Sequence, residues 1–188
     1  MQSNNLKLWY RQPATQWVEA LPIGNGRLGA MVFGDVAHER LQLNEETLWS
    51  GGVREWNTPG AQAALPALRA AIFAGHYTEA DKLAKQLQGP FTQSYQPLGD
   101  LRLNFVHEEG PIKDHYRELD LDTAIASVQY RVINTHFLRE TFVSAPDQAV
   151  VVHLLCDRAG LLNFSATLDS QLRYTTTIEQ DGLLLTGE

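Results

Sequence analysis

Cysteine is nearly absent from this 188-residue chain, which contains only Cys156. No disulfide can therefore form within the chain. Cys156 lies in the apolar stretch 150–156, and we expect its thiol to fill space in a core, as free cysteine usually does. The chain also lacks an apolar run near the roughly 20 residues of a membrane span, and its start lacks the basic and apolar regions of an export signal. We expect a soluble chain with no membrane partner, and its compartment stays open.

Basic residues are too few and too scattered to form a binding surface for phosphate groups. The chain has 15 Lys and Arg against 22 Asp and Glu, a net charge of -7, and no window gathers the basic residues into a run. Binding to a nucleic-acid backbone or an anionic membrane requires such a run. Nucleic acid is thus excluded as an expected partner.

Local patterns for metal or serine chemistry are also missing. No two of the six histidines are spaced as H-x-x-x-H, and none pairs locally with cysteine or a carboxylate at ligand spacing. Ser50 precedes two glycines, but the G-x-S-x-G elbow of a nucleophilic serine also requires a glycine before it. We expect no metal and no cofactor, with histidines that are solvated or structurally hydrogen-bonded.

One glycine motif superficially matches a dinucleotide-binding loop. Residues 24–29, GNGRLG, satisfy G-x-G-x-x-G, and Glu45 or Glu46 supplies an acid about twenty residues later. In that loop a helix follows the glycines and its N-terminus faces the pyrophosphate, whereas here an apolar strand pattern continues through 30–33. We interpret these glycines as providing backbone freedom in a tight loop.

The hydrophobic pattern predicts a mainly β fold with one helical insertion. Apolar residues alternate with polar ones at Val128, Tyr130 and Val132, and similar alternation extends over 150–156 and 162–168. Earlier strands are predicted at 28–36 and 39–43, with helices over 61–74 and from an N-cap at Thr78 to Gly89. We predict an antiparallel β-sandwich with a helical hairpin inserted at about 60–89, and no linker that divides the chain.

Two acidic residues offer a candidate pair for glycoside hydrolysis. Asp120 and Asp122 would point the same way on a strand, about 6.5–7 Å apart at the backbone, which is near the spacing of an inverting carboxylate pair. The same pattern arises whenever Leu119 and Leu121 face a core and their neighbours face solvent. We favour this second interpretation, in which Asp120 and Asp122 lie on the solvated face of a strand. Glu45 and Glu46 are adjacent and would point to opposite faces of an extended chain.

All four tryptophans lie in the first third of the chain, together with Tyr10. Aromatic faces can stack on the C–H faces of sugar rings, so this cluster is a candidate platform for carbohydrate. Large aromatic side chains more often fill a sandwich core or an interface between domains, and we expect that here. The cluster comprises Trp9, Tyr10, Trp17, Trp49 and Trp56.

Five stretches of the sequence resemble the N-terminal part of glycoside hydrolase family 95 α-L-fucosidases. The resemblance covers nearly the whole chain. Its segments are 17–34 (WVEALPIGNGRLGAMVFG), 43–52 (LNEETLWSGG), 95–101 (YQPLGDL), 116–124 (YRELDLDTA) and 139–147 (RETFVSAPD).

The resemblance implies a β-supersandwich that packs on an (α/α)6 barrel, with inverting hydrolysis of an α-linked L-fucosyl or L-galactosyl residue. In that family the catalytic acid and the assisted base belong to the barrel, and no residue here matches them. We therefore expect a non-catalytic domain that lacks the barrel, ends before the family's sandwich does, and self-associates through an exposed sheet edge. Members of the family are often periplasmic or secreted. The expected partners are the barrel and a fucosylated glycan.

Polar residues in the loops are the candidates for contact with the sugar pocket or the barrel. They are Asn25, Arg27, Asn44 and Glu45, with Trp49 as the aromatic member, although tightening of the loops explains them nearly as well. A second hypothesis is a stand-alone carbohydrate-binding module that uses the aromatic cluster. A third is a truncated fragment with no separate function. Exposure of two or more tryptophans on one open face would favour the second hypothesis.

Overall fold

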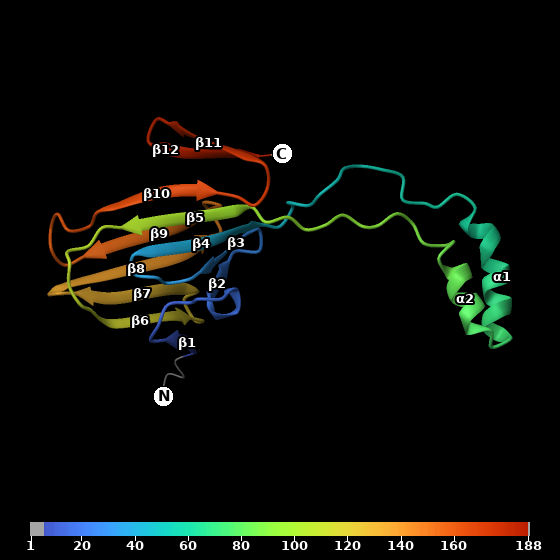
Figure 1. Ribbon diagram of the computed structural model, residues 1–188, viewed down its shortest axis with the longest axis horizontal. Coiled ribbons are helices and arrows are strands. Elements are labelled where there is room, and N and C mark those ends of the chain that lie inside the picture. Colours follow the sequence, from blue (N-terminus) through green and yellow to red (C-terminus); the bar gives the residue numbers. More distant parts are fainter. Residues whose placement is uncertain (1–5, 188) are drawn as a thin grey trace. The chain divides into compact units, whose positions relative to one another are not determined.

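The computed structural model describes residues 6–187 and separates them into two compact units. The first unit contains the chain up to Leu48 and from Pro97 onward, and the second contains Trp49–Gln96 (Figure 1). We expected no dividing linker from the sequence. The reason for the difference is that the stretches flanking the two helices form only a single isolated bridge, between Trp49 and Tyr95, and no regular strand.

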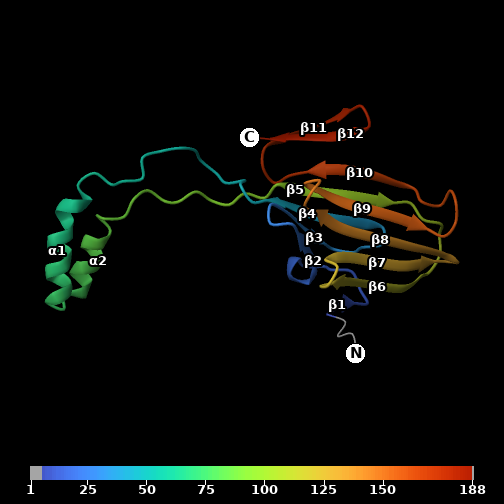
Figure 2. The same ribbon diagram turned by 180° about the vertical axis from the view of Figure 1, so that it is seen from behind.

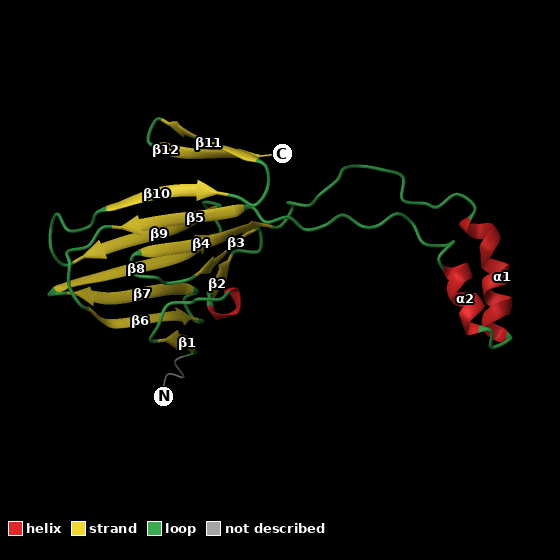
Figure 3. Cartoon of the chain, viewed as in Figure 1, coloured by secondary structure: helices red, strands yellow, loops and turns green. Residues whose placement is uncertain are grey.

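The first unit is an antiparallel β-sandwich, as the alternation pattern predicted. Two five-stranded sheets lie face to face and can be followed from both sides in Figures 1 and 2, and by type of element in Figure 3. One sheet has the order β1 (Lys7–Tyr10), β6 (Ile112–Asp120), β7 (Ile125–Val132), β8 (Thr135–Ser144), β9 (Ala149–Cys156). The other has the order β10 (Phe164–Asp169), β5 (Gly99–Phe105), β4 (His38–Glu45), β3 (Leu28–Val32), β2 (Leu21–Gly24). A hairpin of β11 (Tyr174–Glu179) and β12 (Gly182–Gly187) follows β10.

The turn between β3 and β4 is longer than the sequence predicted. β3 ends at Val32 rather than at residue 36, because the chain turns back at Gly34, whose φ is +78°. The Asp35 carboxylate accepts hydrogen bonds from the backbone N–H groups of Ala37 and His38, at 2.9 and 2.7 Å. An aspartate that binds the backbone two and three residues later stabilises a turn at the expense of a strand.

The main core lies between the two sheets near their middle. Cross-strand pairing places Leu41 beside Val32 on one side and Leu101 on the other, and Val32 beside Leu21, so that apolar side chains form a row across the second sheet. Leu41 is fully buried, and Ala126 of the facing sheet belongs to the same cluster. Such a row on the inner face follows from the two-residue period of a strand.

A second core cluster contains Tyr130 and Phe137, whose rings stack with centroids 5.2 Å apart. Burial raises the pKa of Tyr130 to about 12, so its hydroxyl stays protonated and lies 3.2 Å from His107 Nε2. Cys156 is partly buried and packs against this cluster. The expectation that its thiol fills core space is thus confirmed.

The interior also contains an ion pair between the sheets. Arg139 on β8 and Glu39 on β4 approach to 3.2 Å, with side chains only 3% and 2% exposed. The Glu39 carboxylate accepts hydrogen bonds from the backbone N–H groups of Gly34 and Arg40, at 2.8 and 3.0 Å. Burial raises the pKa of Glu39, and the nearby positive charge of Arg139 opposes that rise.

The second unit is the predicted helical hairpin, formed by α1 (Ala61–Phe73) and α2 (Tyr77–Ala84). The second helix differs from its prediction at both ends. It begins one residue before Thr78, with His76 as its N-cap, and it ends at Ala84 rather than near Gly89. The helices contact each other, and Ala71 and Ala80 are their buried members. Neither helix, nor any other in residues 6–187, is long and apolar enough to cross a membrane.

Candidate functional site

One end of the sandwich brings together three of the residues that the sequence singled out. The turn between β2 and β3 carries Asn25 and Arg27, and β4 ends at Glu45 beside them. The turn between β8 and β9 lies against the same group and contributes Gln148. Leu48, where the first unit gives way to the second, follows Glu45 at this end.

Asn25 holds the β2–β3 turn closed. Its side-chain oxygen accepts hydrogen bonds from the backbone N–H groups of Arg27 and Leu28, at 3.0 and 2.8 Å. Its amide nitrogen donates to the carbonyl of Ser144, at 3.0 Å, and so ties this turn to the end of β8. Gly26 adopts a φ of +95° between them, which is why this tight turn needs glycine. The tight turn is thus confirmed, and β3 rather than a helix follows it, but it comprises residues 25–27 only, because Gly24 belongs to β2 and Gly29 to β3.

Arg27 links two turns through its guanidinium group. Its Nε donates to Glu45 at 3.0 Å, and one terminal nitrogen donates to Gln148 at 3.3 Å. The arginine side chain is 53% exposed, whereas that of Glu45 is 16% exposed. The outer part of Arg27 is thus the portion of this group that a partner or ligand can reach.

The Glu45 carboxylate is held in its charged form. The hydroxyl of Thr47 donates to it at 2.6 Å and the Thr47 backbone N–H at 2.9 Å. These bonds, with a smaller contribution from Arg27, lower the pKa of Glu45 below its ordinary value. A general acid needs a raised pKa near the working pH, so Glu45 is poorly suited to donate a proton to a leaving group.

We expect the Thr47→Val substitution to raise the pKa of Glu45 more than Arg27→Met does, because Thr47 makes the larger contribution. Since the folded pKa lies below the unfolded one, the stabilising effect of Glu45 is present above the unfolded pKa and is lost as pH falls through the folded pKa. A carboxyl-detected NMR titration of Glu45 in both variants measures this. An equal or larger shift in Arg27→Met would show that the ion pair dominates.

The other two candidate residues are Asn44 and Trp49. Asn44 lies opposite Gly29 on β4, and alternation along the strand directs its side chain to the face opposite that of Glu45. Trp49 belongs to the second unit, where its ring contacts Tyr95 edge to face with centroids 5.3 Å apart. The hydrogen bonds described above join Asn25, Arg27 and Glu45, which are three of the five predicted residues.

The sequence pattern did not reveal Gln148. It lies in the turn of residues 145–148 with a φ of +52°, and its own amide donates to the Ala145 carbonyl at 2.6 Å. The only local signal was the segment 139–147, which ends one residue before it. Its pairing with Arg27 spans 121 positions, so no local pattern could have identified it.

Asp120 and Asp122 do not form a carboxylate pair on one strand. β6 ends at Asp120, and Asp122 lies in the following turn. One carboxylate oxygen of Asp120 accepts hydrogen bonds from the backbone N–H groups of Asp122 and Thr123, at 2.9 and 3.1 Å. These bonds, chiefly that from Thr123, lower the pKa of Asp120, and Lys7 lies 3.6 Å away. Asp120 therefore stabilises a turn, and the extended-strand geometry assumed for the pair was wrong.

The tryptophans do not fill the core, which was one of the two positions that the sequence suggested for them; the other, an interface between domains, stays a prediction. All four are at least 42% exposed. Trp9 stacks on Tyr116 in the first unit, and Trp56 lies 4.2 Å from the guanidinium of Arg54 in the second. A core position was wrong because apolar character alone does not tell whether a residue is buried.

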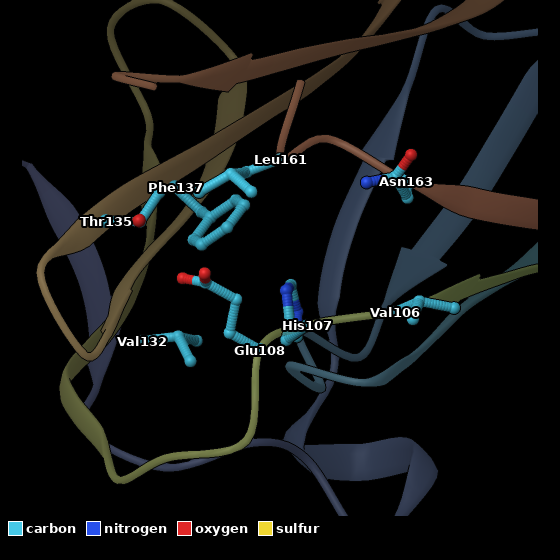
Figure 4. A pocket seen from close by; sticks show the side chains of 8 residues that line it. All are labelled: Val106, His107, Glu108, Val132, Thr135, Phe137, Leu161 and Asn163. Atoms are coloured by element: carbon cyan, nitrogen blue, oxygen red, sulfur yellow. The ribbon is translucent and has the colours of Figure 1, made fainter. Parts of the chain in front are cut away.

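A cavity of about 210 Å³ lies near His107, at the end of β5 and the start of β8 (Figure 4). His107 Nδ1 is buried there with no hydrogen-bond partner, and burial lowers the pKa of this histidine. Glu108 is the single acid in the lining, so the cavity holds no pair of carboxylates for glycoside hydrolysis. Within residues 6–187, no three His, Cys, Asp or Glu side chains group to hold a metal ion. The lining residues are Val106, His107, Glu108, Val132, Thr135, Phe137, Leu161 and Asn163.

Residues 8–188 match a family model described as glycosyl hydrolase family 65, N-terminal domain. The chain is 39% identical over 174 residues to alpha-L-fucosidase 2 of Arabidopsis thaliana. This alignment covers 92% of this chain and 21% of that protein. It is 36% identical over 160 residues to probable alpha-fucosidase A of Aspergillus niger, covering 81% of this chain and 20% of that protein. The Aspergillus oryzae protein of the same name is 27% identical over 173 residues, covering 88% of this chain and 22% of that protein. The chain thus spans about a fifth of the length of these relatives.

Proposed function

The chain belongs to the family of glycosyl hydrolase family 65 N-terminal domains, and from this premise we propose that it is the non-catalytic sandwich of an α-L-fucosidase-type glycoside hydrolase. The observation that carries the proposal is that nearly the whole chain aligns with about a fifth of an alpha-L-fucosidase. The remaining four-fifths of such a protein leaves ample room for a catalytic domain.

The chemistry of the described residues supports a non-catalytic role. Hydrolysis of a glycosidic bond needs one carboxyl group that holds a proton and a second carboxylate placed across the bond. Glu45 and Asp120 both have lowered pKa values and both accept backbone hydrogen bonds in turns. Each therefore acts to fix a turn, and we assign acid and base to another domain of the parent protein.

We further propose that the parent enzyme is of the family 95 type indicated by the resemblance, with inverting hydrolysis of an α-L-fucosyl linkage in an (α/α)6 barrel. In this arrangement the sandwich packs on the barrel. Arg27 is the best-placed contact, because Glu45 and Gln148 fix one side of its guanidinium while 53% of its side chain remains exposed. An arginine positioned in this way can bind a carboxylate or carbonyl of a partner with little loss of side-chain entropy.

An aryl α-L-fucoside assay tests this function. We expect no turnover by the 188-residue chain, and turnover when it is mixed with the separately produced remainder of the parent protein. Turnover by the chain alone would overturn the proposal.

The same mixture tests the contact at Arg27. We expect Arg27→Met to weaken association with the remainder of the parent and to lower the activity recovered. Arg131→Met is the matched control, because that arginine lies on β7 and is similarly exposed, at 47%. Equal effects of the two substitutions would argue against an interface at Arg27.

A further inference from the structure

Trp9 and Tyr116 form an aromatic surface on the outer face of the first sheet. Their rings stack with centroids 6.0 Å apart and an interplanar angle of 26°, and Trp9 is 55% exposed. Cross-strand pairing sets Trp9 of β1 opposite Glu118 of β6, while the buried Arg117 and Leu119 alternate with Tyr116 and Glu118 along β6. The pair therefore faces away from the sandwich core.

Polar groups surround the ring pair in a continuous chain of contacts. The Tyr116 hydroxyl donates to one oxygen of Glu118 at 2.9 Å, and Lys7 donates to the other at 2.7 Å. Lys7 also lies 3.6 Å from Asp120, and the guanidinium of Arg11 lies 6.0 Å from the Trp9 ring centre. The hydrogen bond to Glu118 raises the pKa of Lys7, and that of Asp120 is lowered, so both groups are charged at neutral pH.

The charges of this surface cancel. Two cations, Lys7 and Arg11, stand beside two carboxylates, Glu118 and Asp120. A phosphate backbone would need an excess of positive charge, and an acidic sugar would meet the two carboxylates without a surplus cation. A neutral ligand that carries many hydroxyl groups fits better, since ammonium, guanidinium and carboxylate groups give it both donors and acceptors.

We propose that this surface, formed by Lys7, Trp9, Tyr116 and Glu118, binds a neutral pyranose ring of a glycan. The C–H face of the ring stacks on the exposed indole of Trp9, and its hydroxyl groups hydrogen-bond to Glu118 and Lys7. An aromatic side chain suits this ligand because it offers a rigid apolar face beside polar groups. Such a site holds a sugar without hydrolysing it, so it is independent of the catalytic role proposed for the parent protein.

Binding to the 188-residue chain tests the site directly. Methyl α-L-fucoside, methyl β-D-galactoside and methyl α-D-glucuronide are titrated, with amide NMR shifts as the readout. We expect saturable binding of at least one neutral glycoside on the order of millimolar, with shifts centred on β1 and β6, and weaker binding of the anionic glucuronide.

Two substitutions distinguish the contribution of the Trp9 ring to binding from that of the polar groups. Trp9→Ala is expected to weaken binding roughly tenfold, or about 1.4 kcal/mol, because it removes the aromatic face on which the sugar ring stacks. Glu118→Gln is expected to weaken it severalfold while the stacking remains. Trp17→Ala is the matched control, because Trp17 is 58% exposed and lies outside this surface, in the short helical turn η1 (Trp17–Glu19). It should leave binding unchanged.

Three results would overturn the site. They are the absence of saturable binding by either neutral glycoside, an equal loss in Trp9→Ala and Trp17→Ala, and stronger binding of the glucuronide. A further outcome is that Trp9→Ala leaves sugar binding intact but weakens association with the remainder of the parent protein. That result would identify the surface as a protein interface and would also reject the proposal. Unchanged circular dichroism in each variant shows that the sandwich is folded.

Discussion

Replacement of Arg139 by methionine is expected to lower the free energy of unfolding of the sandwich by about 3–5 kcal/mol. The substitution leaves the Glu39 carboxylate 2% exposed and without its opposite charge. It also removes a guanidinium that lies over the rings of Phe105 and Tyr130, at 4.9 and 5.3 Å. An unpaired buried charge is far more costly than the pair itself. Urea denaturation, followed by circular dichroism of the strands, measures the change.

A double variant identifies the unpaired charge as the cause. Glu39→Gln combined with Arg139→Met should recover a large part of the lost stability, because a neutral amide can still accept the hydrogen bonds of Gly34 and Arg40. Arg131→Met removes an arginine from an exposed pair with Asp114 and should cost only about 0–1 kcal/mol. If the double variant is no more stable than Arg139→Met alone, lost packing around the guanidinium explains the effect.

The fold class could be predicted because the apolar period changes with the type of element. Val128, Tyr130 and Val132 alternate in the sequence and are all buried on one face of β7. The helices follow a different period and form a separate unit. The β3–β4 turn was predicted too short because the bonds that hold it come from the Asp35 side chain, and apolar periodicity contains no information about such bonds.

From the sequence we named Arg27 and Glu45 of the candidate site, but not Gln148. Arg27 and Glu45 are 18 positions apart and meet because β3 pairs with β4. The sequence named them from two separate segments, 17–34 and 43–52, as polar residues in loops. The contact of Gln148 with Arg27 depends on how the strands of the sandwich are arranged, and no local sequence pattern specifies that arrangement. Asn44 and Glu45 are adjacent on a strand, so their side chains point to opposite faces of the sheet, and this could have been predicted from the sequence.

The exposure of Trp9 could not be predicted from the sequence for a different reason. It stands between Leu8 and Tyr10 on β1, so three successive residues are apolar or aromatic and alternation cannot assign a face. The face is decided by pairing with β6, which sets Leu8 beside the buried Leu119 and Trp9 beside Glu118. The same pairing creates the aromatic surface for which we propose a sugar ligand.

Leu41→Ala is expected to destabilise the sandwich by about 2–5 kcal/mol. Leu41 is 0% exposed at the centre of the second sheet, and it packs with Val32 of its own sheet and Ala126 of the facing one. Cross-strand neighbours fix it on both sides, so the surrounding side chains cannot collapse far into the space left by the substitution.

Leu121→Ala is the control for that loss, because it removes the same atoms from a side chain that is 51% exposed in the turn after β6. Its effect should stay within about 1 kcal/mol, since much less apolar area returns to water. Both variants are compared by urea denaturation at one pH. A difference near zero would mean that the sheets separate or repack around position 41, and the row from Leu21 to Leu101 would then not be the centre of the core. A difference of the expected size would show that Leu41 stabilises the core between the two sheets, where it belongs to the same cluster as Ala126 of the facing sheet.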